Sequence, residues 1–213
     1  MGGRQVVVMA RWPAPGRCKR RLAITSGAVA AARVQQRLTA HTLATARQAA
    51  DQVQADLLLA ADGLGPRALR RWGRALGADA AVLQGHGSLG RRMQGQLRRR
   101  FQQGAQQVVL IGTDLPGLEV ADLTVAFDRL QQHPVVLGPA ADGGYWLIGL
   151  TRSGFEQAGA ALMAGMPWGS STVLLATLEA AAARKLKPAL LRQQHDIDRH
   201  ADLAPWMPSR RRR

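Results

Sequence analysis

The chain of 213 residues is long enough for one well-buried domain, and 29 Lys and Arg against 14 Asp and Glu give it a formal net charge of +15. Its one cysteine, Cys18, excludes an internal disulfide and argues against a structural zinc site. No apolar run approaches the roughly 20 residues of a membrane span, and the first residues lack the apolar core of a signal peptide. We therefore expect a soluble cytoplasmic protein with one domain over residues 1–208 and a disordered basic tail at 209–213.

The positive charge suggests a nucleic-acid partner as one interpretation. However, only three of the basic residues are lysines, and the arginines are scattered without a zinc-finger spacing or an aromatic RNA-binding motif. This distribution favours a compositional bias on solvated helix faces. We predict no specific nucleic-acid partner, and the sequence carries no signal for an oligomeric state.

Short apolar runs alternate with helical segments along the chain. The runs that predict strands are residues 5–10, 55–61, 80–83, 107–112, 134–138 and 145–150, with a final strand near 189–198. The segments that predict helices are residues 28–52, 65–76, 89–103, 119–131 and 171–184. This alternation is typical of an α/β fold with a mainly parallel sheet.

The loop after the first strand is rich in proline and basic residues, in the stretch "ARWPAPGRCKRRL". Backbone N–H groups near Gly16 could bind the phosphates of a nucleotide, as in other strand–loop–helix sites. The charges of Arg17, Lys19 and Arg21 would neutralise those phosphates. Taken alone, the stretch is better explained as an ordinary basic surface loop.

A second loop, "GHGSLG" at Gly85–Gly90, fits the G-x-G-x-x-G dinucleotide fingerprint, and Asp114 follows near the end of the next strand. The preceding strand is short, however, and Gln84 separates it from the first glycine. The pattern by itself is weak.

Aspartates follow two of the predicted strands. The run "VVLIG" has no polar residue and predicts a strand buried on both faces, so Asp114 would stand at its carboxyl end, where ligands of α/β sheets collect. Asp196 and Asp198 are two apart and would share one face of an extended chain, where they repel unless a cation lies between them. Mg²⁺ or Mn²⁺ would suit these oxygen ligands. The alternative is a solvated loop in which each aspartate caps the backbone.

A third loop, "GPAADGGYWLIGL", places Gly143 and Gly144 behind Asp142. The glycines would let the backbone approach a ligand, and Asp142 could accept a hydrogen bond from a sugar hydroxyl or orient a nucleophile. A tight turn between two strands explains the same residues equally well.

Six motifs in order, "PAPGRCKRRLA", "GSLGRRM", "IGTDLPGL", "GPAADGGYWLIGL", "PWGSSTV" and "DIDRHADL", span nearly the whole chain. Together they resemble the bacterial glycosyltransferase-like proteins of the DUF2064 family, which are linked to radical-SAM partners and arsenosugar biosynthesis. The resemblance displaces the dinucleotide interpretation. It implies a nucleotide-diphospho-sugar transferase fold, a GT-A-like three-layer sandwich with a mainly parallel central sheet.

The resemblance also implies a metal-dependent transferase that uses a nucleotide-activated donor, most simply a nucleotide sugar, and a small-molecule acceptor. The alternatives are nucleotidyl transfer from an NTP to a small phosphorylated acceptor, as in the more distantly similar guanylyltransferases, and a degenerate sugar-nucleotide binder. The implied roles are as follows: nucleotide binding by Arg11, Gly16, Arg17, Lys19 and Arg21; Mg²⁺ or Mn²⁺ binding by Asp114, Asp196 and Asp198; substrate binding by Gly87, Gly90, Gly143, Gly144 and Trp168; and acceptor activation by Asp142.

Four positions depart from the family's pattern. Arg11 replaces a usual lysine and Arg20 a usual threonine, and both changes are mild for phosphate binding. Ser88 and Gly117 each stand where the family has an acid. Loss of these acids bears on substrate choice and is the reason for keeping the non-catalytic alternative.

Overall fold

The computed structural model describes residues 3–206, so the predicted tail at 209–213 lies outside the described residues. The elements follow in chain order: β1 (Arg4–Arg11), α1 (Arg20–Ser26), α2 (Ala28–Val53), β2 (Ala55–Asp62), α3 (Pro66–Ala75), β3 (Ala80–Leu83), α4 (Leu89–Gln102), β4 (Gln107–Ile111), α5 (Val120–Arg129), β5 (Val135–Pro139), β6 (Tyr145–Thr151), α6 (Arg152–Ala158), α7 (Val173–Ala182), β7 (Ala189–Leu190) and the 3₁₀ helix η1 (His200–Trp206).

Within residues 3–206 the strands form a seven-stranded sheet in the order β3-β2-β1-β4-β6-β5-β7. β6 runs antiparallel to both of its neighbours, β4 and β5, and the other pairings are parallel. The chain builds outward from β1 to β3 and then returns to place β4 on the other side of β1. The carboxyl ends of β1 and β4 therefore flank the switch point, where open α/β sheets bind ligands.

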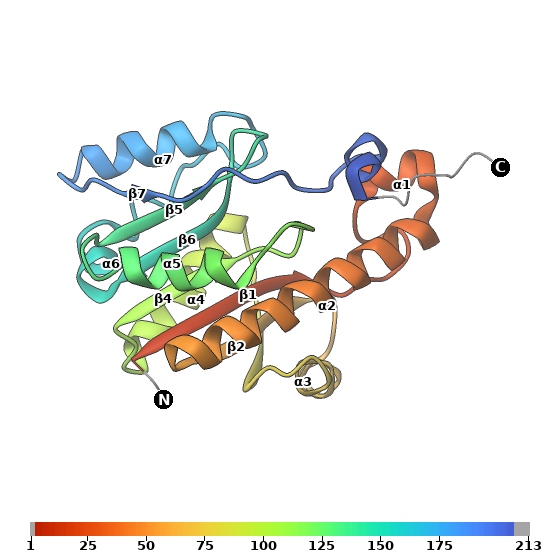
Figure 1. The fold of residues 1–213 in the computed structure, drawn as a ribbon, viewed down its shortest axis with the longest axis horizontal. Coiled ribbons are helices and arrows are strands. Elements are labelled where there is room, and N and C mark those ends of the chain that lie inside the picture. The colour runs from red at the N-terminus through yellow and green to blue at the C-terminus, as the bar shows by residue number, and fades with distance from the viewer. Residues whose placement is uncertain (1–2, 207–213) are drawn as a thin grey trace.

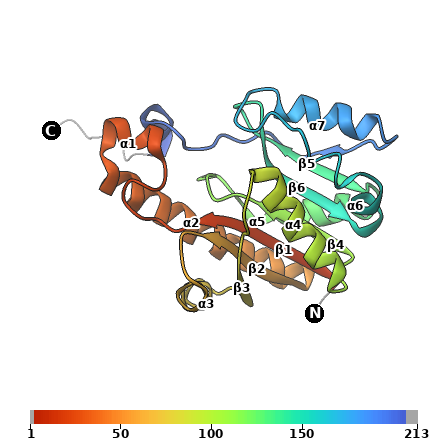
Figure 2. The same ribbon diagram turned by 180° about the vertical axis from the view of Figure 1, so that it is seen from behind.

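Helices cover both faces of the sheet, which makes three layers (Figures 1 and 2). Side chains of α2 and α5 pack on one face, with Leu43 and Phe127 fully buried. Side chains of α4, α6 and α7 pack on the other face, and Leu97 is fully buried there. Because both faces are covered, β1 and β4 are buried on both sides, as the unbroken apolar runs predict.

A small lobe extends beyond the sheet at the carboxyl end of β1. It consists of α1, the start of α2 and η1, which lie together at one end of the molecule in both views (Figures 1 and 2). Leu22, Leu38 and Ile197 form its buried core, against which Leu203 packs. Residues near both ends of the described chain therefore come together beside the switch point.

Most predicted elements are confirmed, and the main differences lie in the last third of the chain. The final strand is limited to Ala189–Leu190, with one further bridge between Ala140 and Gln194. The backbone leaves the sheet because polar side chains of this segment bind α5 instead: Gln194 donates to Asp122 at 2.9 Å, and Arg192 pairs with the same carboxylate at 2.5 Å. The short helices α1 and α6 and the 3₁₀ helix η1 were not delimited from the sequence.

Candidate active site

A cleft of about 580 Å³ opens at the carboxyl ends of β1 and β4. It is lined by ten residues proposed from the sequence, Arg11, Arg17, Lys19, Arg21, Asp114, Asp142, Gly144, Trp168, Asp196 and Asp198. These residues come from five separate segments of the chain, and the switch point of the sheet brings them together. Their roles remain predictions, whereas their convergence is a property of the fold.

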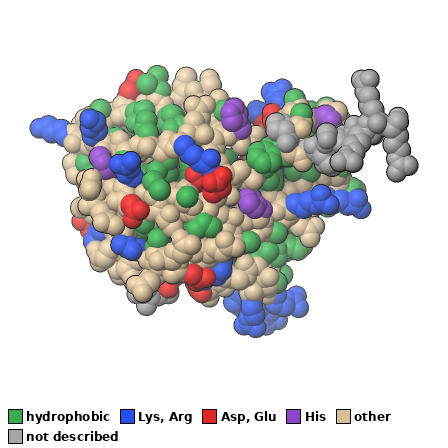
Figure 3. Space-filling view, in the orientation of Figure 1, with side chains coloured by type: hydrophobic (Ala, Val, Ile, Leu, Met, Phe, Trp, Pro, Cys, Tyr) green, Lys and Arg blue, Asp and Glu red, His purple; other side chains and the backbone are tan. Residues whose placement is uncertain are grey.

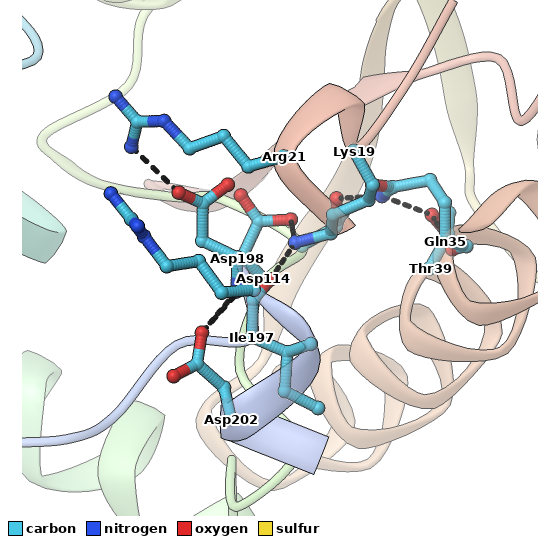
Figure 4. Close-up of polar contacts among 10 residues, drawn as sticks. Lys19, Arg21, Gln35, Thr39, Asp114, Ile197, Asp198 and Asp202 are labelled. Atoms are coloured by element: carbon cyan, nitrogen blue, oxygen red, sulfur yellow. Dashed lines mark hydrogen bonds and ion pairs between the residues drawn. The ribbon is translucent and has the colours of Figure 1, made fainter. Parts of the chain in front are cut away.

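Lys19 stands at the centre of the polar contacts drawn in Figure 4. Its ammonium group contacts Asp114 Oδ1 at 2.6 Å and donates to the backbone carbonyl of Ile197, and its side chain is only 4% exposed. The backbone of Lys19 is left-handed, with φ of 47°, just before α1 begins. Lys19 thus joins the first loop to the end of β4 and to the carboxyl-terminal segment.

A second ion pair lies beside the first. Arg21 contacts Asp198 Oδ2 at 2.7 Å, and both side chains are partly exposed (Figure 4). The carboxylate of Asp202 accepts hydrogen bonds from the backbone N–H groups of Asp198 and Arg199, at 2.9 and 2.6 Å. These bonds hold the turn that leads into η1 and fix Asp198 at the rim of the cleft.

Asp196 differs from Asp114 and Asp198 because it makes no ion pair within residues 3–206. Burial raises its pKa above the ordinary aspartate value, and the carboxylates of Asp142 and Asp114 raise it further. The carboxylates of Asp142 and Asp114 therefore both repel ionised Asp196. A cation bound between these carboxylates would relieve their repulsion.

The acidic residues fit a hard divalent ion in their chemistry, since carboxylate oxygens are the ligands that Mg²⁺ and Mn²⁺ prefer. Two of these side chains, however, are already ion-paired. Asp114 is turned to Lys19 and Asp198 to Arg21, and within residues 3–206 no set of three or more His, Cys, Asp or Glu is arranged as one metal-binding group. The three aspartates line one cleft, and their role as ligands of one ion stays a prediction.

Asp142 occupies the turn between β5 and β6. Its carboxylate accepts a hydrogen bond from Gly144 N at 2.9 Å, and the side chain is exposed to the cleft. Gly143 has φ of +87°, and a Cβ there would lie 2.0 Å from the carbonyl oxygen of Ser171. The tight turn expected as one alternative is present, and it presents Asp142 to the cleft.

The other predicted glycines do not line the cleft. Gly16 and Gly87 have positive φ and shape the loops before α1 and α4. Gly90 lies in the first turn of α4, where a Cβ would be 2.2 Å from Met163 O and 2.7 Å from Trp168 Nε1. Gly90 therefore affects the cleft indirectly, because its lack of a side chain leaves room for Trp168, which lines the cleft. The dinucleotide fingerprint follows the edge strand β3 and neither of the strands that flank the switch point, so the structural context of that motif is missing, although Leu89 of this stretch lines the cleft.

The two lost acids have structural explanations. Ser88 is the N-cap of α4 and accepts a hydrogen bond from Arg91 N at 3.4 Å, a role that serine and aspartate share. At Gly117 a Cβ would lie 3.3 Å from the Trp206 ring, so an acidic side chain would meet the indole. The glycine at position 117 therefore leaves the space that Trp206 of η1 occupies.

Sequence reasoning missed polar residues that shape the cleft. Gln84 donates to Ala10 O and Ala60 O, at 2.8 and 3.2 Å, and accepts from Arg92 at 2.8 Å. Gln35, in α2, donates to Thr113 Oγ1 at 2.9 Å. A polar residue directly after the strand at residues 80–83 was the available signal for Gln84, but its partners could not be read from the sequence.

Comparisons with known proteins identify the family and the fold. The family described as "Uncharacterized protein conserved in bacteria (DUF2064)" matches residues 42–170. A crystal structure of a proposed nucleotide-diphospho-sugar transferase from Desulfovibrio desulfuricans G20 has a TM-score of 0.84 and 27% identity, over 99% of this chain and 89% of the other. The search of the curated proteins gave no match.

Two more distant structures share the fold. The 4-diphosphocytidyl-2C-methyl-D-erythritol synthase of Anaerococcus prevotii DSM 20548 has a TM-score of 0.62 and 9% identity, over 95% of this chain and 96% of the other. The glucosyl-3-phosphoglycerate synthase of Mycobacterium tuberculosis, in complex with Mn²⁺ and UDP, has a TM-score of 0.54 and 11% identity, over 95% and 75%. The fold is therefore that of nucleotide-diphospho-sugar transferases and cytidylyltransferases.

Proposed function

Because the chain belongs to the DUF2064 family and has the nucleotide-diphospho-sugar transferase fold, we propose that it is a transferase that takes a nucleotide-activated donor, most simply a nucleotide sugar. The observation that carries the proposal is the cleft itself. Cationic side chains from one loop face carboxylates from three other segments at the switch point of the sheet. This is the charge arrangement that a diphosphate and a divalent ion would need.

The cationic side of the cleft would hold the donor. Four basic residues border it: Arg11 at the end of β1, Arg17 and Lys19 in the loop that follows, and Arg21 at the start of α1. Guanidinium groups suit phosphate oxygens because they can donate two parallel hydrogen bonds, and a lysine adds a point charge.

A divalent ion would be held by Asp196 together with Asp114 and Asp198. When bound, it would neutralise the diphosphate leaving group. For this to happen, Lys19 and Arg21 must give up their carboxylate partners, and the donor phosphates are the natural new partners for both. In the structure, the two ion pairs balance the charges of Asp114 and Asp198.

Asp142 would serve the acceptor. In glycosyl transfer the acceptor oxygen forms a bond to the anomeric carbon while the bond from that carbon to the diphosphate breaks, and nucleoside diphosphate leaves. The acceptor proton passes to the Asp142 carboxylate, which faces the cleft next to the turn glycines. The second candidate is nucleotidyl transfer, favoured by the cytidylyltransferase likeness, in which an acceptor phosphate attacks an NTP and pyrophosphate leaves.

The proposal is tested by a thermal-shift screen of nucleotides and nucleotide sugars, each with Mn²⁺ and with EDTA, because a specific ligand raises the melting temperature by mass action. We expect one nucleoside diphosphate sugar to stabilise the protein with Mn²⁺ and much less with EDTA. Stabilisation by NTPs alone, with pyrophosphate release, would favour nucleotidyl transfer. Failure of every nucleotide to stabilise the protein would contradict the proposal.

A further inference from the structure

The charges in the cleft are segregated by their origin in the chain. The basic residues that line it come from residues 11–21 and from Arg92 of α4. Among the described residues that line the cleft, those from positions 110–198 include no Lys or Arg. We call this part of the lining, contributed by residues 110–198, the far half of the cleft, and it carries only acidic, apolar and uncharged polar groups.

The far half has an aromatic wall. Tyr145 and Trp168 meet edge to face, with ring centroids 5.9 Å apart and an interplanar angle of 73°. Leu110 and Ile148 form an apolar floor beside them, and both are almost fully buried. Gly90 leaves the space in which the Trp168 ring sits.

Next to this wall stand the carboxylates. Asp142 is exposed to the cleft, and Asp196 lines the same cleft. Two of the cations that line the cleft are engaged, because Lys19 binds Asp114 and Arg21 binds Asp198. An anionic molecule bound against Trp168 would be repelled by the carboxylates of Asp142 and Asp196. The cleft-lining residues at 110–198 include no Lys or Arg that could compensate for this repulsion.

We propose that the far half of the cleft binds an uncharged, hydroxyl-bearing acceptor with an apolar or aromatic face, and that it rejects phosphorylated acceptors. Trp168 and Tyr145 supply the stacking surface, and Asp142 accepts from the hydroxyl. The proposal rests on the proposed function, because it names the acceptor of that same site. It favours glycosyl transfer over nucleotidyl transfer to a phosphate.

The test compares two probes with one skeleton, 2-phenylethanol and 2-phenylethyl phosphate, by NMR titration of the full chain. Excess inorganic pyrophosphate is present throughout to occupy the cationic half of the cleft. We expect 2-phenylethanol to bind at least tenfold more tightly than its phosphate ester. Trp168→Ala should weaken binding of 2-phenylethanol about tenfold, and Trp168→Phe should retain most of the affinity for it.

The Asp142→Asn variant separates the effect of the Asp142 charge from its structural role in the turn. The amide oxygen can still accept from Gly144 N, so the turn is kept. Affinity for the phosphate ester should rise about 5- to 10-fold while affinity for the alcohol changes little, because only the charge is removed. Equal affinity of the two probes, or no effect of Trp168→Ala on the alcohol, would overturn the proposal. Nucleotide binding in the screen above is independent of these probes, so failure of the proposed function would be recognised separately.

Discussion

Lys19 is the residue on which the arrangement of the cleft depends most. Its ammonium group is nearly inaccessible, yet its partner Asp114 is half exposed, at 52%. The sequence indicated a basic residue in a phosphate-binding loop. It could not indicate the partners, because Asp114 and Ile197 lie 95 and 178 positions away and only the folded sheet brings them near.

Replacing Lys19 by alanine should weaken binding of a nucleoside diphosphate about tenfold or more, since a charge-assisted hydrogen bond is worth roughly 1.5–3 kcal/mol. Binding of the corresponding nucleoside should change much less. Calorimetric titration of both ligands measures the difference. Lys187→Ala is the matched control, because Lys187 is exposed and lies outside the cleft. An equal loss for nucleoside and diphosphate would show that Lys19 acts only through folding.

Asp196 predicts a pH dependence of stability. Burial and then Asp142 raise its pKa in the folded state, so ionised Asp196 opposes folding above that raised pKa. Below the ordinary aspartate pKa the side chain is protonated in both states and contributes nothing. In EDTA, Asp196→Asn should therefore melt higher than the wild type at pH 7, and the difference should fade as the pH is lowered towards the ordinary aspartate value. A variant that melts lower at pH 7 in EDTA would contradict this.

At the scale of elements, α4 carries one glycine that the fold needs and one that it does not. Gly90 is buried against Met163 and Trp168, whereas a Cβ at Gly95, five residues later in the same helix, meets nothing within 4 Å. Gly90→Ala should cost about 1–3 kcal/mol through overpacking, and should move Trp168. Gly95→Ala should stabilise the protein by about 0.5–1 kcal/mol, because glycine is a poor helix former.

Chemical denaturation of the two alanine variants measures both effects on stability. The difference in tryptophan fluorescence between Gly90→Ala and the double variant Gly90→Ala, Trp168→Phe isolates the emission of Trp168 and reports its displacement. Equal stability of the two variants would show that the contact between α4 and the Trp168 loop is not tight in solution.

The strands and most helices could be predicted because apolar periodicity is local. β4 is the clearest example, since an unbroken apolar run specifies a strand buried on both faces. The segment after β7 could not be predicted, because the side chains of Arg192 and Gln194 are bound by Asp122 of α5, some 70 positions earlier. A polar contact of this kind leaves no periodic signal.

At the scale of the whole molecule, part of the positive charge lies outside the cleft. Figure 3 shows Lys and Arg side chains projecting at the lower edge, over α3. Arg67, Arg70, Arg71 and Arg74 together line a shallow groove there, at helical spacing on one face. None of the four makes an ion pair within residues 3–206. No helix in residues 3–206 has the length and apolar character needed to cross a bilayer.

This surface should attract nucleic acid weakly and without sequence preference, and the attraction should collapse as salt rises because phosphate contacts release counterions. The double variant Arg70→Glu and Arg74→Glu should lower the affinity for a labelled oligonucleotide at low salt and leave nucleotide-sugar binding unchanged. Fluorescence anisotropy at low and physiological salt measures the first quantity. Tight, sequence-selective binding at physiological salt would point instead to a nucleic-acid function.

The most direct test of the whole account is calorimetric titration of the nucleotide sugar selected by the screen, with Mn²⁺ and with EDTA, into the wild type, Asp196→Asn and the control variant Gly95→Ala. We predict metal-dependent binding in the wild type and the control, and at least tenfold weaker binding with Mn²⁺ in Asp196→Asn, because an amide is a poorer ligand for a hard cation. Binding of equal affinity in all three proteins, unchanged by EDTA, would contradict a metal-assisted donor site at the switch point of the sheet.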